Sequence, residues 1–461
     1  MASLTTRNPA TGEDLRTYDI MDRRKAMAVL GRAHAAWQDW RLVPAPARAA
    51  KMTDLAAVLR ENRDDYARLM TLEMGKPLTE ALGEVEKCAW LCDHYAEHAP
   101  GWLADEEVAV DGLRHRVVYQ PLGVVLSIMP WNYPFWQALR FGVPTLAAGN
   151  ASLLKHASNV TGCGLAIAEA FARAGFPEGL FATVVADHGT VAELIARDEV
   201  RGVSLTGSTG AGERIAELAG RHLKKVVLEL GGSDPFIVLE DADLDFAARG
   251  AVTGRMLCTG QSCIASKRFI VVREVADAFA ERFAGLMSEL RVGDPLDPAT
   301  QVGTIVNRQE LETLEAQLAD AVDRGATVLT GGARLPGAGW FLPPTVVTGV
   351  TPDMRLAREE VFGPIAPVLV VEDAEEAVAL ANDSEFGLGG SVWTADIDRG
   401  EALARRLEAG TVFVNSFVKS DPRMPFGGVK KSGLGRELAR FGLREFTNIQ
   451  GVNVYAHGGD G

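Results

Sequence analysis

Between residues 122 and 230 the chain alternates short, continuously apolar segments with helical stretches. Continuously apolar strands are typical of sheets that are covered on both faces, and strict strand–helix alternation predicts a parallel sheet with helices on each side. The sequence therefore predicts an α/β fold. The expected strands are 122–129, 151–155, 181–185, 201–206 and 225–230, and the expected helices are 134–148, 160–175, 189–197 and 210–223.

A second unit is expected after Gly231-Gly232, because 461 residues are too many for one ordinary core and the later sequence has an alternation of its own. A β-hairpin is expected at 108–119, where the Asp111-Gly112 pair is a turn signal and where a projecting hairpin would suit subunit contact. The other expected elements are helices 22–40, 44–74, 78–105, 243–257 and 274–290, and strands 267–272, 367–371, 388–394 and 410–414.

Charge and cysteine content limit the possible partners and the compartment. The formal net charge of −14 disfavours nucleic acid or an anionic membrane, and a small anionic substrate would need a local cation to overcome it. Five cysteines, an odd number without framework spacing, favour reduced thiols and a cytoplasmic protein. The first residues lack the apolar core of a secretory signal, and no run of about 18 apolar residues is present to span a membrane.

No metal site is expected. Cys88 and Cys92 lie four residues apart on a predicted helix, where they read better as buried small side chains than as metal ligands. The eight histidines show no metal-binding pattern.

Four chemically useful residues lie at or just beyond the ends of predicted strands. Ligands of parallel sheets bind at the carboxyl ends of strands, so this common placement predicts one binding edge. A thiol in the second unit, Cys263, would reach this edge only through a cleft between the two units. The four residues are Asn132, Lys155, Gly207 and Glu229.

Cys263 and Glu229 are the candidate nucleophile and base. Cys263 follows Gly260 and Ser262, small residues that would let the backbone approach a ligand, although a lone cysteine is more often an inert buried side chain. Glu229 ends an apolar strand, so partial desolvation would raise its pKa toward the range of a general base. The alternative for Glu229 is a strand-end carboxylate bound by backbone donors.

Asn132 and the helix after it are expected to line the site. Asn132 can donate an amide N–H to an oxyanion, with the backbone N–H of Cys263 as a second donor, or it can simply cap the helix that begins near Pro134. Trp136 and Arg140 are four residues apart and therefore share a helix face, which would form one wall of the site. A surface ion pair is the alternative for Arg140.

The segment 204–212 joins a strand to a helix and is rich in glycine, but it is not a dinucleotide fingerprint, and a tight turn explains it equally well. Lys155 ends a strand and is placed to contact a ribose or phosphate. An acidic residue near the ribose would repel a 2′-phosphate. Because Lys155 is followed by His156 and Ser158 instead, NADP or dual use is favoured over NAD alone.

Nearly the whole chain resembles the aldehyde dehydrogenase superfamily, and within it the bacterial NAD(P)-dependent succinate-semialdehyde dehydrogenases. The resemblance depends on several motifs that occur together and in order. These are Met129-Pro-Trp-Asn-Tyr-Pro134, Leu205-Thr-Gly-Ser208, Leu228-Glu-Leu-Gly-Gly232, Gly260-Gln-Ser-Cys263, Glu359-Glu-Val-Phe-Gly-Pro364 and Pro425-Phe-Gly-Gly-Val-Lys-Lys-Ser-Gly433.

The resemblance implies a role for each site residue. Cys263 would be the nucleophile, Glu229 the base and Asn132 part of the oxyanion hole. Arg140 and Ser420, with Trp136 beside them, would bind the distal carboxylate of a small-molecule aldehyde, as a guanidinium suits a carboxylate. The residues implied for the cofactor, NADP by preference or NAD, are Trp131, Lys155, His156, Ser158, Gly207, Ser208, Leu230, Glu360 and Phe362.

The resemblance also implies a domain plan. A Rossmann-like cofactor domain would comprise 1–106 and 121–230, and an α/β catalytic domain 231–430. A small β oligomerisation arm with the C-terminal segment, 107–120 and 431–461, would make the chain a homodimer or a dimer of dimers.

Succinate semialdehyde is the expected substrate, oxidised to succinate through a thiohemiacetal and a thioester. Three alternatives stay open. One is a dehydrogenase for another ω-carboxylate or aliphatic aldehyde. Another is a non-catalytic binding protein of the same fold, which would be expected to have lost Cys263, Glu229 or Asn132. The last is a thiol hydrolase, for which no motif supplies a histidine partner.

Overall fold

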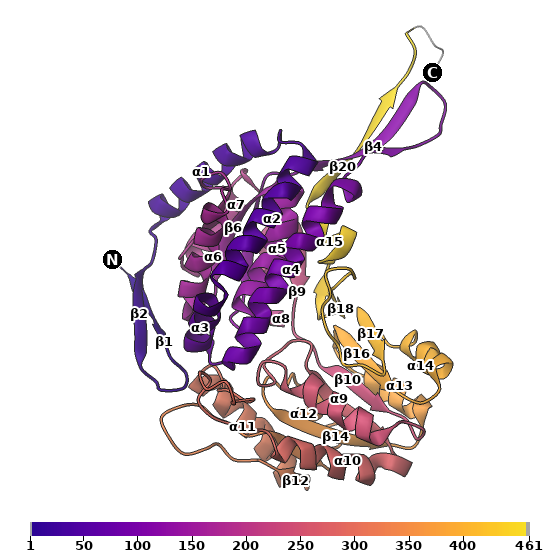
Figure 1. The fold of residues 1–461 in the computed structure, drawn as a ribbon. Helices are drawn as coiled ribbons and strands as arrows, with labels where there is room; N and C mark the ends of the chain where they lie inside the picture. Colours follow the sequence, from indigo (N-terminus) through magenta and orange to yellow (C-terminus); the bar gives the residue numbers. More distant parts are fainter. Residues whose placement is uncertain (1, 458–461) are drawn as a thin grey trace.

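The computed structural model describes residues 2–457 and confirms the α/β fold. Its two main sheets lie in different parts of the molecule, and a two-stranded arm projects from one end (Figure 1). The first sheet has the order β19-β9-β8-β5-β6-β7, in which β19 is antiparallel and the other strands are parallel. Its strands are β5 (Val124–Met129), β6 (Ala151–His156), β7 (Phe181–Thr183), β8 (Val200–Thr206), β9 (Lys225–Glu229) and β19 (Gly433–Leu434).

Strand order in this sheet reverses between β5 and β8. The chain runs outward from β5 through β6 to β7, and then returns to the other side of β5 as β8 and β9. Ligands of open α/β sheets bind at such a reversal, beyond the carboxyl ends of the strands. The segments that leave these two ends contain Asn132 and Gly207, so the expected binding edge coincides with the topological switch point.

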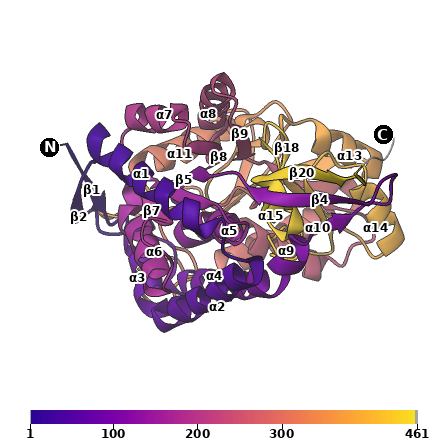
Figure 2. The ribbon, with the colours of Figure 1, turned by 90° about the horizontal axis from the view of Figure 1, so that it is seen from above.

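Helices cover both faces of the first sheet (Figure 2). One face is covered by α5 (Pro134–Ala147) and α6 (Thr161–Arg173), with an outer layer of α2 (Ala45–Glu61), α3 (Arg63–Met74) and α4 (Leu78–Trp102). The other face is covered by α1 (Arg23–Trp40), α7 (His188–Ala196) and α8 (Thr209–Arg221). A short 3-10 helix, η1 (Ser158–Val160), precedes α6, and α15 (Ala439–Glu445) packs on α4 and α5.

The second sheet has seven strands in the order β12-β13-β14-β11-β10-β16-β17. They are β10 (Asp234–Val238), β11 (Ser266–Val272), β12 (Thr327–Thr330), β13 (Thr345–Thr348), β14 (Ile365–Val371), β16 (Gly389–Trp393) and β17 (Thr411–Val414). Around them lie α9 (Leu244–Met256), α10 (Arg273–Ser288), α11 (Arg308–Asp323), α12 (Arg355–Arg358), α13 (Ala374–Asn382) and α14 (Ile397–Ala404). Two small pairs complete the fold: β1 (Ser3–Arg7) with β2 (Asp14–Asp19), and β15 (Phe386–Gly387) with β18 (Val429–Lys430).

The projecting arm differs from the predicted hairpin. β4 (Arg114–Pro121) pairs with only two residues of β3 (Glu106–Glu107), and its main partner is β20 (Thr447–Val454), which follows it along eight residues. Figure 1 shows β4 and β20 side by side in the arm. A partner more than 300 residues away leaves no trace in local turn chemistry, so the turn signal indicated a hairpin alone, and only the resemblance placed the C-terminal segment in the same arm.

One further local prediction was wrong, and the central strand β10 was not predicted at all. The helix expected at 44–74 is broken at Asn62, whose side-chain amide donates to the Val58 carbonyl at 2.7 Å and whose backbone leaves the helical region. Such local hydrogen bonds compete with helix continuation. Strand β10 was missed because Pro235 near its start argues against a central strand.

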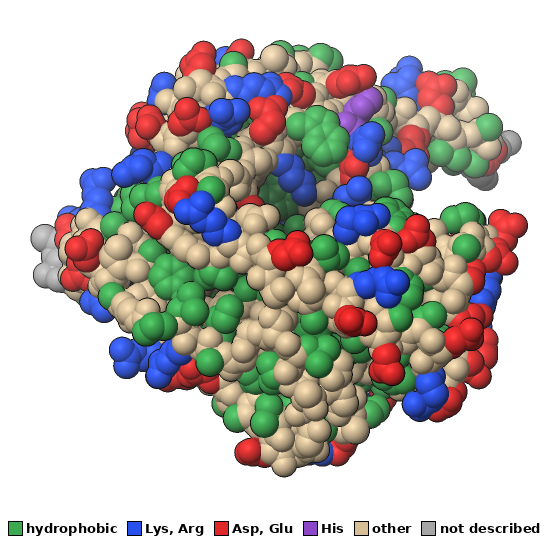
Figure 3. Space-filling model, turned by 60° about the horizontal axis from the view of Figure 1, so that its bottom comes forward, with side chains coloured by type: hydrophobic (Ala, Val, Ile, Leu, Met, Phe, Trp, Pro, Cys, Tyr) green, Lys and Arg blue, Asp and Glu red, His purple; other side chains and the backbone are tan. Residues whose placement is uncertain are grey.

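The described surface mixes charges of both signs, and Figure 3 shows acidic and basic side chains interspersed over one face. Among residues 2–457 no helix is both long enough and apolar enough to cross a bilayer.

Candidate active site

Cys263 lies in the loop that joins α9 to β11. The backbone is left-handed at Cys258, Thr259 and Gly260, with φ of 54°, 57° and 76°. This conformation is costly for a β-branched residue, and such strain is concentrated at functional sites. A Cβ at position 260 would lie 2.4 Å from the Gly363 carbonyl oxygen, so glycine is required there. The close approach at Gly260 is therefore to the chain itself, whereas the sequence predicted approach to a ligand.

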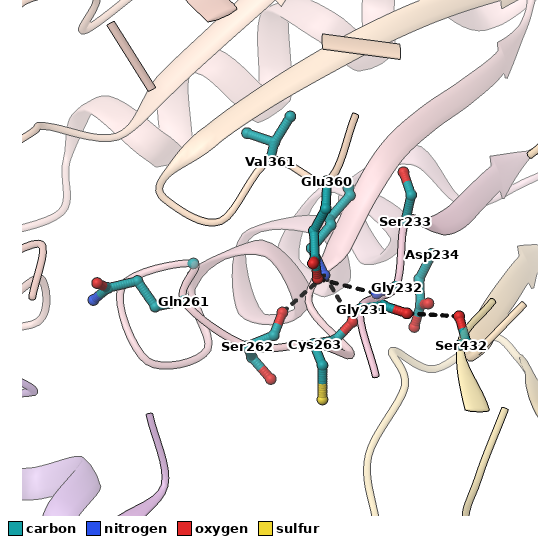
Figure 4. Close-up of polar contacts among 12 residues, drawn as sticks. Gly231, Gly232, Ser233, Asp234, Gln261, Ser262, Cys263, Glu360, Val361 and Ser432 are labelled. Carbon is teal, nitrogen blue, oxygen red and sulfur yellow. Dashed lines mark hydrogen bonds and ion pairs between the residues drawn. The ribbon is translucent and has the colours of Figure 1, made fainter. Parts of the chain in front are cut away.

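Lys267 fixes the backbone of this loop. Its buried ammonium donates to the carbonyl oxygens of Ser262 at 2.8 Å and Cys263 at 2.7 Å, and it forms an ion pair with Glu360 at 3.3 Å. Figure 4 shows these oxygens converging while the Cys263 sulfur points away from them. Sequence reasoning missed Lys267. A lysine inside an apolar strand is nevertheless a signal of a specific interaction, because a buried charge must be paired.

Two pockets meet at Cys263. The first encloses about 250 Å³, and the three residues predicted to bind the substrate, Trp136, Arg140 and Ser420, line it. The second encloses about 200 Å³ on the side of the first sheet. Cys263 lines both, so a molecule in either pocket lies against the thiol. Seven residues predicted for the cofactor or the oxyanion line the second pocket: Trp131, Asn132, Gly207, Ser208, Leu230, Glu360 and Phe362.

The chemistry of the second pocket fits a dinucleotide. Ser208 caps α8, its hydroxyl accepting from the Ala211 N–H at 3.4 Å, and the N–H groups at a helix N-terminus suit a phosphate. The rings of Trp131 and Phe362 lie edge to face, 5.7 Å apart, and give the pocket apolar walls. Glu360 accepts from the Gly232 N–H at 3.0 Å, which holds its carboxylate at the rim where it can meet a ribose hydroxyl.

Asn132 is buried and firmly held. Its side-chain N–H donates to the Gln261 carbonyl at 3.0 Å, and its side-chain oxygen accepts from the Tyr133 N–H at 3.2 Å. The first bond ties the end of β5 to the loop of Cys263. An amide NH₂ has two hydrogens, so one is left for an oxyanion.

Glu229 is buried at the end of β9 and lines neither pocket. Among residues 2–457 its carboxylate oxygens have no hydrogen-bond partner. Burial raises the pKa of Glu229, the nearby Glu437 carboxylate raises it further, and Arg140 and Arg436 oppose both effects. The charge of Glu229 in turn raises the pKa of Cys263, so the two groups are within electrostatic reach.

Arg140 is not the free cation that its predicted role requires. Its side chain is 2% exposed and forms an ion pair with Glu437, which is 5% exposed. The ring of Phe426 lies against the guanidinium, 4.7 Å from its carbon. The ion pair that was the alternative for Arg140 is therefore present, but in the interior rather than at the surface. Glu437 comes from the C-terminal segment, and the sequence reasoning gave it no role.

The three polar residues predicted to favour NADP lie apart from both pockets. Lys155 is half-buried, and Ser158 is exposed at the start of η1. His156 is buried, with Nε2 donating to the Pro134 carbonyl at 2.9 Å and Nδ1 accepting from the Ala157 N–H at 3.0 Å. These contacts hold the His156 ring against the start of α5. Its predicted contact with a cofactor stays a prediction.

The Cys263 thiol is protonated at neutral pH in this arrangement. Burial raises its pKa to about 12, although the Lys267 and Arg140 cations oppose the shift. A thiol is a weak nucleophile, so attack on a carbonyl requires the proton to leave as the bond forms.

The match to a family model agrees with this geometry. Residues 2–452 match the model of the aldehyde dehydrogenase family. The chain belongs to the aldehyde dehydrogenase family, and the fold expected from the resemblance is confirmed.

The relatives are similar over their full length. A protein of Synechocystis sp. (strain PCC 6803) named "Probable succinate-semialdehyde dehydrogenase" (NADP(+)) is 48% identical over 98% of this chain and 99% of its own. The Escherichia coli K12 protein named succinate semialdehyde dehydrogenase (NAD(P)+) Sad is 47% identical over 96% of both chains. A Streptococcus pyogenes succinic semialdehyde dehydrogenase, solved with NADP+ as the cofactor, superposes with a TM-score of 0.96 at 37% identity, over 98% of this chain and 100% of its own.

Proposed function

We propose that the protein oxidises succinate semialdehyde to succinate with NADP+ or NAD+. The observation that carries the proposal is the position of Cys263, whose side chain forms part of the wall of two separate pockets. An aldehyde in the first pocket and a dinucleotide in the second would both contact the sulfur. The names and cofactors of the relatives support this choice of aldehyde and of dinucleotide.

The reaction begins with attack of the Cys263 sulfur on the aldehyde carbon while the thiol proton passes to solvent, which gives a tetrahedral thiohemiacetal. The remaining side-chain N–H of Asn132 and the backbone N–H of Cys263 stabilise its oxyanion, and each such donor typically contributes about 10²–10³ in rate. NADP+ or NAD+ held in the second pocket, against Trp131, Ser208 and Phe362, would supply the hydride acceptor, and loss of hydride would leave a thioester on Cys263. Glu229 then takes a proton from water as the water attacks the thioester. The bond between the Cys263 sulfur and the carbonyl carbon breaks, the sulfur receives the proton from Glu229, and succinate leaves.

Glu229 must move to act on that water. Its carboxylate lies outside both pockets, packed so closely against the backbone at Gly427 that a Cβ there would lie 2.8 Å from Oε1. A rotation of the Glu229 side chain toward Cys263 would bring it to the thioester. The raised pKa is suited to a base that must also release its proton near neutral pH.

We also propose a homodimer or dimer of dimers in the cytoplasm, built on the predicted division into 1–106 with 121–230, 231–430, and 107–120 with 431–461. Residues 458–461 lie outside the described part of the chain. Leu113, Ile449 and Tyr455 on the arm are all more than half exposed, and apolar groups in such a projection suit burial in a second subunit. The free cysteines support a reducing compartment.

The test is the fate of the acyl group. Cys263→Ala should abolish turnover, and Glu229→Gln should accumulate a succinyl thioester on Cys263, visible by intact-protein mass spectrometry. Wild-type enzyme should prefer succinate semialdehyde to butanal, an uncharged aldehyde with the same number of carbons. Turnover by Cys263→Ala, or no preference between the aldehydes, would contradict the proposal.

A further inference from the structure

The first pocket contains a second cation, Lys87 on α4, which the sequence did not single out. Its Nζ lies 4.2 Å from the centroid of the Trp136 ring, and it donates to the Ser420 hydroxyl oxygen at 2.8 Å. Lys87 therefore links Trp136 and Ser420, two of the three residues that were predicted to bind the substrate. It lies on the same pocket wall as both of them.

The bond from Lys87 sets the direction of the Ser420 hydroxyl. An ammonium has three hydrogens and no acceptor, so the Ser420 oxygen must accept and its own hydrogen is free to donate elsewhere. The bond to Ser420 uses one of the three hydrogens of the Lys87 ammonium, so others remain for a ligand. The pair thus presents an O–H and an N⁺–H donor from one place, as recognition of a carboxylate needs.

The neighbouring charges leave Lys87 without a counterion. Arg140 forms its ion pair with Glu437, and Glu84 forms one with the buried Lys76. Asp421, next to Ser420, forms a salt bridge with Arg423 at 2.6 Å. Within residues 2–457 no carboxylate lies within salt-bridge distance of Lys87.

We propose that Lys87 is the specificity residue of the first pocket, and that it binds the distal carboxylate of the aldehyde together with the Ser420 hydroxyl. This inference rests on the proposed function and deepens it. Arg140, neutralised by Glu437, then contributes a neutral ion pair to the pocket, and the charge that selects an anionic aldehyde comes from Lys87.

The electrostatics of the site agree. Burial and the nearby Arg140 cation lower the pKa of Lys87 to about 8, and the opposing effects of Cys88, Glu84 and Asp421 only partly offset them. A carboxylate placed beside the ammonium would restore the charged form, so substrate and proton would bind together.

The test is a comparison of Lys87→Met with wild type on two aldehydes. Methionine keeps a long apolar stem against Trp136 and removes the charge. For succinate semialdehyde, kcat/KM should fall about 10–100-fold, mainly through KM, as expected for loss of a charge-assisted hydrogen bond. For butanal, kcat/KM should change less than about 3-fold, since the uncharged aldehyde makes no such bond. Succinate, the product, should inhibit Lys87→Met more weakly than wild type.

Three variants serve as controls. Lys87→Arg keeps a cation and should retain the preference for succinate semialdehyde. Lys87→Gln repeats the loss of charge with a polar end, in case the methionine variant does not fold. Lys25→Met, at an exposed position of α1, should leave the kinetics with both aldehydes unchanged.

The outcomes separate this inference from the proposed function. Wild-type enzyme without a preference for succinate semialdehyde would overturn both. A wild-type preference that persists in Lys87→Met and Lys87→Gln would overturn the role of Lys87 alone. Equal losses for both aldehydes would also overturn it, because they would indicate a general packing role.

Discussion

Replacing Glu437 with glutamine should change the pH dependence of the reaction through Glu229. Glu437 and Glu229 are both buried near Arg140, and the charge of Glu437 is, after burial, the largest contribution that raises the pKa of Glu229. Glu437→Gln removes this repulsion and leaves the shape of the side chain almost unchanged. It also releases from its ion pair the Arg140 guanidinium, a cation that already lowers the pKa of Glu229.

Both consequences act in the same direction. A neighbouring charge within contact range typically shifts a carboxyl pKa by about 1–3 units, and each unit corresponds to about 1.4 kcal/mol. The pKa of Glu229 should therefore fall by about 1–3 units in Glu437→Gln. A base is active in its ionised form, which exists above its pKa. The rising limb of the pH–rate profile for thioester hydrolysis should accordingly move to lower pH.

The hydrolysis step can be followed by single-turnover release of succinate from acylated enzyme between about pH 5 and 9, a range that brackets a raised carboxyl pKa. Glu229→Gln is the control, since it should remove the limb in both backgrounds and so assign it to Glu229. A limb that stays in place in Glu437→Gln, or moves to higher pH, would refute the electrostatic reasoning.

The free energy of unfolding of Glu437→Gln also tests the ion pair between Arg140 and Glu437. Breaking a buried pair by removing one partner typically costs about 3–5 kcal/mol, because an uncompensated charge stays buried. If Glu229 takes over as the partner of Arg140, Glu437→Gln should lose less than that. The double variant Glu229→Gln/Glu437→Gln should then lose more than the two single losses combined, in chemical denaturation without cofactor. Additive losses would show that the two carboxylates do not share Arg140.

Two further predictions concern residues near the end of β6. Ser158→Glu should reduce kcat/KM for NADP at least about 10-fold and change that for NAD little, because a carboxylate near the ribose repels a 2′-phosphate; equal effects on both cofactors in steady-state assays would place Ser158 away from the ribose. His156→Gln should lose less stability than wild type as the pH falls from 6.5 to about 4. Burial lowers the pKa of His156 from 6.5 to about 4, so between these values the unfolded wild-type chain binds a proton that the folded chain does not. Stability contributed by neutral His156 is complete above pH 6.5 and falls by roughly 3 kcal/mol as the pH drops to about 4, and denaturation midpoints of the variant that follow wild type across this window would contradict the interpretation.

Local patterns predicted the first sheet well for a physical reason. Its strands are continuous apolar runs and its helices begin at clear signals, such as Pro134 at the first turn of α5 and Ser208 capping α8. Both kinds of signal lie within a few residues of what they specify. The position of Asn132 and Gly207 beyond strand ends followed from the same local information, since parallel strands bring their carboxyl ends to one edge.

The features that local patterns did not predict depend on contacts between segments that are far apart in the sequence. The turn signal gave the hairpin without its main partner, β20, which only the resemblance placed in the arm, and the spacing that gave Arg140 its place did not give Glu437, which lies almost 300 residues later. Helical spacing correctly placed Arg140 beside Trp136, and both line the first pocket, but spacing says nothing about which charge is already paired. Lys87 was passed over for the same reason. A single lysine on a long helix reads as a solvated charge until the fold shows that it is half-buried beside Ser420.

The acidic balance of the chain makes Lys87 more important than one charge among many. With a net charge of −14, the protein as a whole repels an anionic aldehyde. Glu84 and Arg140, which line the first pocket, are each neutralised by a buried partner, Lys76 and Glu437 respectively. Burial raises the pKa of Glu80 to about 7, which limits its negative charge. The local field is then set by Lys87 and by the exposed Lys419 at the pocket lining. An anion that reaches the pocket thus leaves an overall negative field for a positive one, and its carboxylate is drawn to the wall where Lys87 and Ser420 offer their hydrogens.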